Sequence, residues 1–285
     1  MEKTMAAAKH ADQPTSKAPG PMLEDDFEPP RKRELPGWLV TSLSLVVLLI
    51  AWQILGRSVN PVLGSYPTAV AEAFWQLLSS GELLKALGTS LQSFAAGYVA
   101  AIVIGVPLGL VIGRSRFLEN AIGVYITAGN AMPLVAFVPL LVLWFGLGFT
   151  VKAVIVFLMS MFPIAINTWA GVRSVPKTLI EVGRSFVAPP SVILRRIILP
   201  ATLPYIMTGV RLAVGRAVVA MVIAEFFTAI SGLGGIIINS ANNFETATMF
   251  VPIVIIMVLA TLLNGFVGYI ERKVAPWQFE LSDRE

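Results

Sequence analysis

Between Glu181 and Pro200 the chain reads EVGRSFVAPPSVILRRIILP, a polar and basic stretch set among long apolar runs. Proline removes a backbone donor and restricts the residue before it, so the pair Pro189 and Pro190 must end a first short helix. A second helix can begin near Pro190, because proline is well placed in a first helical turn. We expect Pro200 to end that second helix. The stretch therefore predicts two short helices joined at an angle, too short to cross a membrane.

The whole chain has the composition of a membrane protein. Of its 285 residues, 56% are hydrophobic and only 13% are charged, a balance that one soluble core cannot hide. The net charge of +4 could suggest nucleic acid, but the basic residues cluster beside apolar runs, so we expect no nucleic-acid partner. The chain has no cysteine, and its single histidine, His10, lies near the N-terminus. We therefore expect no resident metal and no cofactor.

Six apolar segments predict an all-α membrane protein with six transmembrane helices, because each segment approaches or exceeds the roughly 20 residues that a helix needs to cross. Five of them are free of charge and cover residues 39–56, 86–113, 120–151, 153–172 and 246–270. The sixth, at about 203–230, contains Arg211, Arg216 and Glu225. Since 120–151 is longer than one crossing and holds Pro133 and Pro139, we expect a broken or kinked span followed by a turn at 146–149.

The chain divides into three predicted parts. Residues 1–36 mix alanine, lysine, proline and acidic residues without hydrophobic periodicity, which predicts a disordered cytoplasmic tail. Residues 37–277 form the predicted transmembrane domain, in which the loop occupies 174–202. A second short cytoplasmic tail follows at 278–285.

Basic residues give the predicted orientation, because cytoplasmic loops carry an excess of lysine and arginine. One side of the six spans collects most of them: Arg31, Lys32, Arg33, Arg114, Arg116, Arg173, Lys177, Arg184, Arg195, Arg196, Arg272 and Lys273. The other side has only Arg57, Lys85 and Lys152. Both termini and the loop are therefore predicted to be cytoplasmic, with 67–80 as a short amphipathic helix at the outer surface.

Small residues recur every four positions in the second span, at Gly97, Ala101, Gly105, Gly109 and Gly113. In lipid such a stripe lets helix backbones approach closely. It predicts tight helix packing, either within one subunit or across a dimer.

Glu225 is the costliest residue of the spans, since a carboxylate there costs roughly 2.5 to 3.5 kcal/mol on insertion scales unless it faces protein or water. Arg216 cannot pair with it along the same helix, because nine residues at about 100° each place the two on opposite faces. Glu225 must therefore meet another span or a cavity, either in a buried hydrogen bond or in contact with substrate. Arg211 and Arg216 lie toward the cytoplasmic half of this span, where each either snorkels and braces the loop or binds an anionic substrate.

Three asparagines complete a candidate translocation path with Arg216 and Glu225: Asn130, Asn167 and Asn239. Single polar residues within spans can also knit helices together, so both interpretations stay open for each asparagine.

The 181–200 stretch resembles the cytoplasmic EAA loop in the permease subunits of bacterial ABC importers. That pattern is Glu-Ala-Ala, three residues, Gly, nine residues, Ile, one residue and Leu-Pro. Here Glu181 stands at the glutamate, and Ile197, Leu199 and Pro200 stand at the distal end with the full spacing.

The chain departs from this pattern at three positions. Val182 and Gly183 stand at the two alanines, and Val187 stands at the glycine. Glycine would permit a positive φ that valine disfavours, so we expect the turn to have moved to 188–190.

The resemblance extends from Trp38 to about Trp277, and the run from Pro204 to Gly234 looks like the branch handling nitrate, sulfonates, taurine and related small anions. It implies a permease subunit of the bacterial inner membrane, a second copy as partner, and an external solute-binding protein. It also implies that separate ATPase subunits bind the loop at Glu181, Gly183, Val187, Ala188, Ile197, Leu199 and Pro200. The chain itself has no Walker A motif, so we expect it to be a transport subunit and not an enzyme.

Two other classes remain possible from the residues alone. An ion- or proton-coupled secondary transporter could use Glu225 as its proton carrier. A membrane-embedded enzyme would need a cluster of carboxylates or histidines at one membrane face, and Glu225 stands alone in its span.

Overall fold

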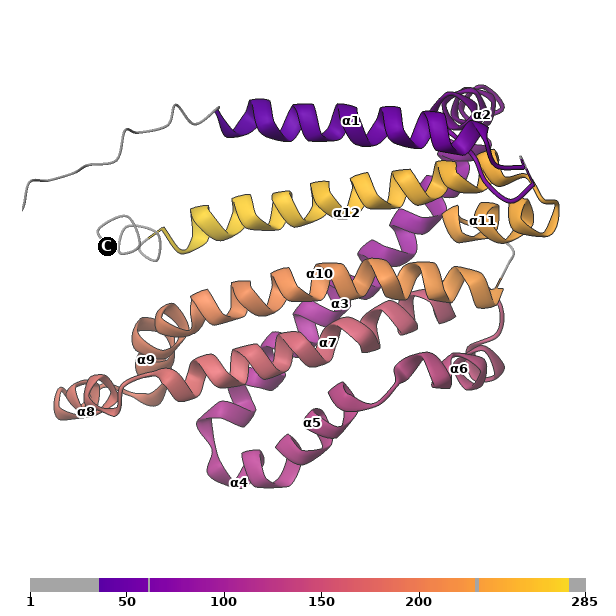
Figure 1. Cartoon of the computed structure of the whole chain (residues 1–285). Coiled ribbons are helices and arrows are strands. Elements are labelled where there is room, and N and C mark those ends of the chain that lie inside the picture. The colour runs from indigo at the N-terminus through magenta and orange to yellow at the C-terminus, as the bar shows by residue number, and fades with distance from the viewer. Residues whose placement is uncertain (1–35, 61, 229–230, 277–285) are drawn as a thin grey trace, which may run out of the picture. The chain divides into compact units, whose positions relative to one another are not determined.

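The computed structural model describes residues 36–60, 62–228 and 231–276, and all the regular structure in these ranges is helical (Figure 1). Among the described residues, five helices are long and apolar enough to cross a membrane: α1 (Gly37–Arg57), α3 (Glu82–Arg114), α7 (Phe149–Ser174), α10 (Leu199–Thr228) and α12 (Thr246–Val274). The predicted tails fall outside the described ranges, apart from Pro36.

The predicted long span is broken. Its first arm consists of α4 (Arg116–Leu118), the π-helical turn η1 (Glu119–Gly123) and α5 (Val124–Ala131). Its second arm consists of the 3-10 helix η2 (Leu134–Phe137) and α6 (Val138–Phe145), and the two arms bend by 87°. The break falls at Met132 and Pro133, and the turn before Phe149 lies where it was predicted. Counted as one span, the bent pair brings the candidate spans to six.

The chain forms two units, and the first ends within α1 at Val47. In the second unit, the last turns of α1 are tied to the segment before α2 (Pro67–Ser79), because the Trp52 indole donates to the Ser65 carbonyl at 2.9 Å. α2 confirms the short helix predicted at 67–80.

The centre of the second unit is α7, which packs along both α3 and α10 (Figure 1). Glycines on α3 make this approach possible. A Cβ atom on Gly109 would lie 2.5 Å from the Ala165 carbonyl oxygen, and one on Gly105 would lie 3.1 Å from that of Met161. The small-residue stripe therefore faces α7, which confirms packing within one subunit.

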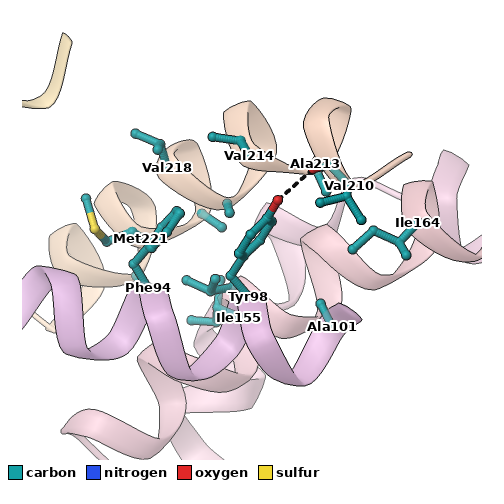
Figure 2. Close-up of a cluster of buried hydrophobic side chains, with 14 of the residues drawn as sticks. Phe94, Tyr98, Ala101, Ile155, Ile164, Val210, Ala213, Val214, Val218 and Met221 are labelled. Atoms are coloured by element: carbon teal, nitrogen blue, oxygen red, sulfur yellow. Dashed lines mark hydrogen bonds between the residues drawn. The ribbon is translucent and has the colours of Figure 1, made fainter. Parts of the chain in front are cut away.

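A buried apolar cluster joins the same three helices (Figure 2). Phe94 and Tyr98 of α3 stack with ring centroids 5.4 Å apart, and Met221 of α10 lies in the same cluster. The Tyr98 hydroxyl donates to the Val210 carbonyl at 2.7 Å, which satisfies the polar end of a buried ring (Figure 2). This cluster packs α10 against α3 and α7.

The loop contains two short helices, as predicted, but its second helix does not end at Pro200. After α8 (Lys177–Ser185), α9 (Pro190–Ile193) leads through the π-helical turn η3 (Leu194–Ile198) directly into α10. Proline cannot donate to the preceding turn, and its ring crowds the carbonyl there. The wider turn, in which the Leu199 N–H donates to the Leu194 carbonyl, makes room for Pro200 and lets the helix continue.

Candidate functional site

The tip of the loop is an exposed apolar surface. Phe186 is 82% exposed and Val187 is 88% exposed, and Val182 of α8 is exposed as well. Contiguous apolar side chains outside a protein core commonly mark a contact surface. Phe186 was not among the predicted site residues, although a large apolar residue directly before the turn was a signal for it.

Val187 makes the turn itself, so the expectation that the turn had moved to 188–190 is wrong. Its φ is 54°, a left-handed conformation that a β-branched residue disfavours. Two hydrogen bonds hold it there: the Val187 N–H donates to the Arg184 carbonyl at 2.8 Å, and the Ala188 N–H donates to the Gly183 carbonyl at 3.1 Å. This is a Schellman closure, which caps α8 and fixes the exposed tip.

The base of the loop is packed against the spans. Gly183 is buried, and a Cβ atom there would lie 2.9 Å from Cδ1 of Ile197, so glycine lets α8 rest on η3. Ile193 and Ile198 are buried in one cluster with Val172 at the end of α7. A displacement of the tip would therefore be passed to both α7 and α10.

The seven predicted loop residues fall into two groups. The structure buries or half-buries four of them and exposes the other three: Gly183, Ala188, Ile197 and Pro200, against Glu181, Val187 and Leu199. The first group supports the loop and the second group faces outward.

Two of the candidate path residues meet within the spans. The Arg216 guanidinium of α10 donates to the Asn130 side-chain oxygen of α5 at 2.6 Å, and both residues are half-buried. The pair joins α10 to the broken span. A guanidinium carries five N–H donors, so this bond leaves other donors of Arg216 for an anion.

The other asparagines have different surroundings. Asn167 donates to the Pro163 carbonyl of its own helix at 2.8 Å. Asn239 is exposed on α11 (Leu233–Asn242), where it lines a cavity of about 210 Å³ with Lys85 and Glu82. Neither residue contacts the Arg216 and Asn130 pair through a hydrogen bond among the described residues.

Glu225 is fully buried, and both of its carboxylate oxygens have partners. The Ser90 hydroxyl donates to Oε1 at 2.6 Å, and the Gly234 N–H donates to Oε2 at 2.8 Å. The Leu233 N–H in turn donates to the Ser90 hydroxyl at 2.9 Å. Glu225 and Ser90 thus take up the free N–H groups at the start of α11, where the helix dipole favours a negative charge.

Lys152 completes this cluster from α7 and is only 2% exposed. Its ammonium donates to the Ser231 carbonyl at 2.9 Å and to the Ser231 hydroxyl at 3.0 Å, three residues before Gly234, which donates to Glu225. Two opposite charges thus bind the two ends of the segment 231–234. Sequence reasoning placed Lys152 outside and missed this role, although the uncompensated charge of Glu225 called for a cation from another span.

Residues 105–276 match the family described as the binding-protein-dependent transport system inner membrane component. This match covers more than half of the chain, including the loop, Arg216 and Glu225. The chain belongs to this family of ABC importer permeases. The permease is 32% identical to the putative aliphatic sulfonates transport permease SsuC of Bacillus subtilis, over 88% of this chain and 91% of that protein.

Two further comparisons extend this result. The permease is 33% identical to the riboflavin transport system permease RibX of Chloroflexus aurantiacus, over 83% of this chain and 89% of that protein. A chain of the inward-facing MetNI methionine ABC transporter shares its fold, with a TM-score of 0.60 and 20% identity, over 69% of this chain and 97% of that one.

Proposed function

We propose that this permease is the membrane-spanning subunit of an ATP-driven importer in a bacterial cytoplasmic membrane, and that it engages a separate ATPase through the 181–200 loop. The observation that carries the proposal is the exposed tip at Phe186 and Val187, which is followed by a helix from Pro190 that continues into α10. The positive-inside rule supports a cytoplasmic position for this loop and for both termini.

The contacts at the base of the loop suggest how a movement of the ATPase is transmitted to the transmembrane helices. Because α9 and η3 run into α10, and Ile193 packs beside Val172 of α7, a moving ATPase would shift these two helices together. In a homodimer, two such loops would rock two sets of spans around one path. Such a shift requires that the partner binds the two states differently. An external solute-binding protein would deliver substrate to the opposite face.

We infer that the substrate is a small organic or inorganic anion of the sulfonate, taurine or nitrate kind. The Arg216 guanidinium supports this inference, since it is half-buried within a span and retains donors beyond its bond to Asn130. The relative SsuC, whose name refers to aliphatic sulfonates, supports it as well. A proton-coupled transporter using Glu225 has less support, because Glu225 is fully buried and serves α11.

Co-purification tests the coupling proposal. The tagged chain is isolated from its native membranes, and its partners are identified by mass spectrometry. We expect an ATPase and a solute-binding protein with the natural chain, and loss of the ATPase with Phe186→Asp. Phe117→Asp is the matched control, because Phe117 is 77% exposed and lies outside the loop. Equal recovery of the ATPase with both variants would overturn the proposal.

Uptake by the assembled transporter tests the substrate class. Arg216→Gln should lower sulfonate or nitrate uptake by roughly 10- to 100-fold, the expected loss of one hydrogen bond to a charged group. Arg211→Gln also removes a guanidinium from α10, but Arg211 is exposed and its charge is paired with Glu271, so uptake should change less. Unchanged anion uptake in Arg216→Gln, or uptake of only uncharged compounds, would contradict the anion assignment.

A further inference from the structure

A cavity of about 300 Å³ lies at the junction of the loop with the ends of α3 and α7. Its walls include Val172, Ile193 and Ile198, which belong to one buried cluster. A packed floor of this kind is already formed before any ligand arrives. The volume is at the small end for ligand sites and suits a compact headgroup.

Two arginines lie among the walls of this cavity. Arg114 ends α3, and Arg184 lies in the last turn of α8. Within the described ranges, neither guanidinium has an ion pair or a side-chain hydrogen bond, and no carboxylate is among the walls. Arg173 nearby differs, because it is paired with Glu119. The cavity thus combines apolar side chains with two positive charges that have no partner among the described residues.

The cavity also lies at a membrane boundary. Arg114 is the first charged residue after the apolar segment 86–113, so it stands where α3 leaves the hydrocarbon region. Basic pockets between transmembrane helices at this level are suited to the phosphate of an anionic lipid, with apolar walls for the adjoining glycerol and acyl carbons.

We propose that this cavity binds the phosphate headgroup of an anionic phospholipid, between Arg114 and Arg184. Arginine suits this ligand because its planar fork donates two parallel hydrogen bonds to phosphate oxygens. The bound headgroup ties α8 to the end of α3 and so fixes the base of the loop at the membrane surface. The site lies outside the path through the spans, and its walls Arg184 and Ala188 adjoin the exposed tip without including Phe186 or Val187.

Lipid retention by the full-length chain tests the proposal without a transport assay. The chain is purified in a neutral detergent and titrated with phosphatidylglycerol or with phosphatidylcholine, and bound lipid is counted by native mass spectrometry. We expect one saturable phosphatidylglycerol site and no matching phosphatidylcholine site. Arg114→Gln and Arg184→Gln should each weaken it by about fivefold.

Arg116→Gln is the matched control, because Arg116 is exposed, as Arg114 and Arg184 are, but is not a wall of the cavity. Equal phosphatidylglycerol retention in all three variants would overturn the proposal. A competition arm adds soluble glycerol phosphate at the same concentration. If glycerol phosphate, which has no acyl chains, displaces the bound phosphatidylglycerol at this concentration, the site takes a soluble phosphate ester. That result would also overturn the assignment to lipid. A thermal unfolding curve for each variant confirms that it is folded.

Discussion

The tip of the loop and the cluster around Glu225 differ in the burial and hydrogen bonding of their side chains. At the tip, Phe186 and Val187 are almost fully exposed, and Val187 holds a left-handed backbone conformation. At the cluster, Glu225 and Lys152 are buried, and their charged groups are hydrogen-bonded. The apolar side chains of the tip are open to contact by a partner protein. The charged groups of the cluster already have their hydrogen-bond partners within the same chain. The difference distinguishes a candidate docking site from a structural core of unusual polarity.

The largest effect should come from removing one charge of the cluster. Glu225→Leu leaves the Lys152 ammonium without its buried counter-charge, which typically costs about 3 to 5 kcal/mol. The free energy of unfolding, measured by titrating the detergent-solubilised chain with a denaturing detergent, checks this value. Glu82→Gln is the control, since Glu82 is an exposed carboxylate.

A double variant sharpens the same point. If the two charges act as a pair, Glu225→Leu combined with Lys152→Met should be less destabilising than the sum of the two single changes. Simple additivity would show that the residues contribute separately to the segment 231–234.

A moderate effect is expected where α3 meets α7. Gly109→Ala places a methyl group 2.5 Å from the Ala165 carbonyl oxygen, and overpacking of this kind costs about 1 to 3 kcal/mol. Gly88→Ala on the same helix meets nothing within 4 Å and should be neutral or slightly stabilising. Thermal unfolding midpoints of the two variants check the prediction. A Gly109→Ala variant as stable as Gly88→Ala would exclude close packing of α3 on α7.

The smallest effect concerns the strained turn. Val187→Gly relieves a left-handed conformation that costs an L-residue about 1 to 2 kcal/mol, but it also frees the unfolded chain, so stability should stay equal or rise slightly. Val182→Gly removes a neighbouring exposed valine from within α8 and should cost about 0.5 to 1 kcal/mol. The denaturation midpoints of the two variants check this prediction. A loss for Val187→Gly as large as that for Val182→Gly would contradict the strain.

Local patterns in the sequence predicted the spans, a broken or kinked span over 120–151 and the two short helices of the loop, because each depends on neighbouring residues. They failed where a contact between distant residues, or an unusual local backbone conformation, determines the structure. The helix runs through Pro200 because a π-helical turn accommodates it, and Val187 makes the turn because two hydrogen bonds hold it. Glu225 clearly needed a partner, but Ser90 lies 135 residues away, and no local pattern in a single sequence links the two.

The absence of cysteine in the natural chain allows a direct test of where a partner binds. Single variants Phe186→Cys and Phe117→Cys are treated in native membranes with a short bifunctional thiol-to-amine reagent, and the products are identified by mass spectrometry. If the loop tip docks on an ATPase, Phe186→Cys yields an adduct with an ATPase subunit and Phe117→Cys yields little or none. An ATPase adduct from Phe117→Cys alone, or none from Phe186→Cys in membranes where the ATPase still co-purifies, would contradict the account.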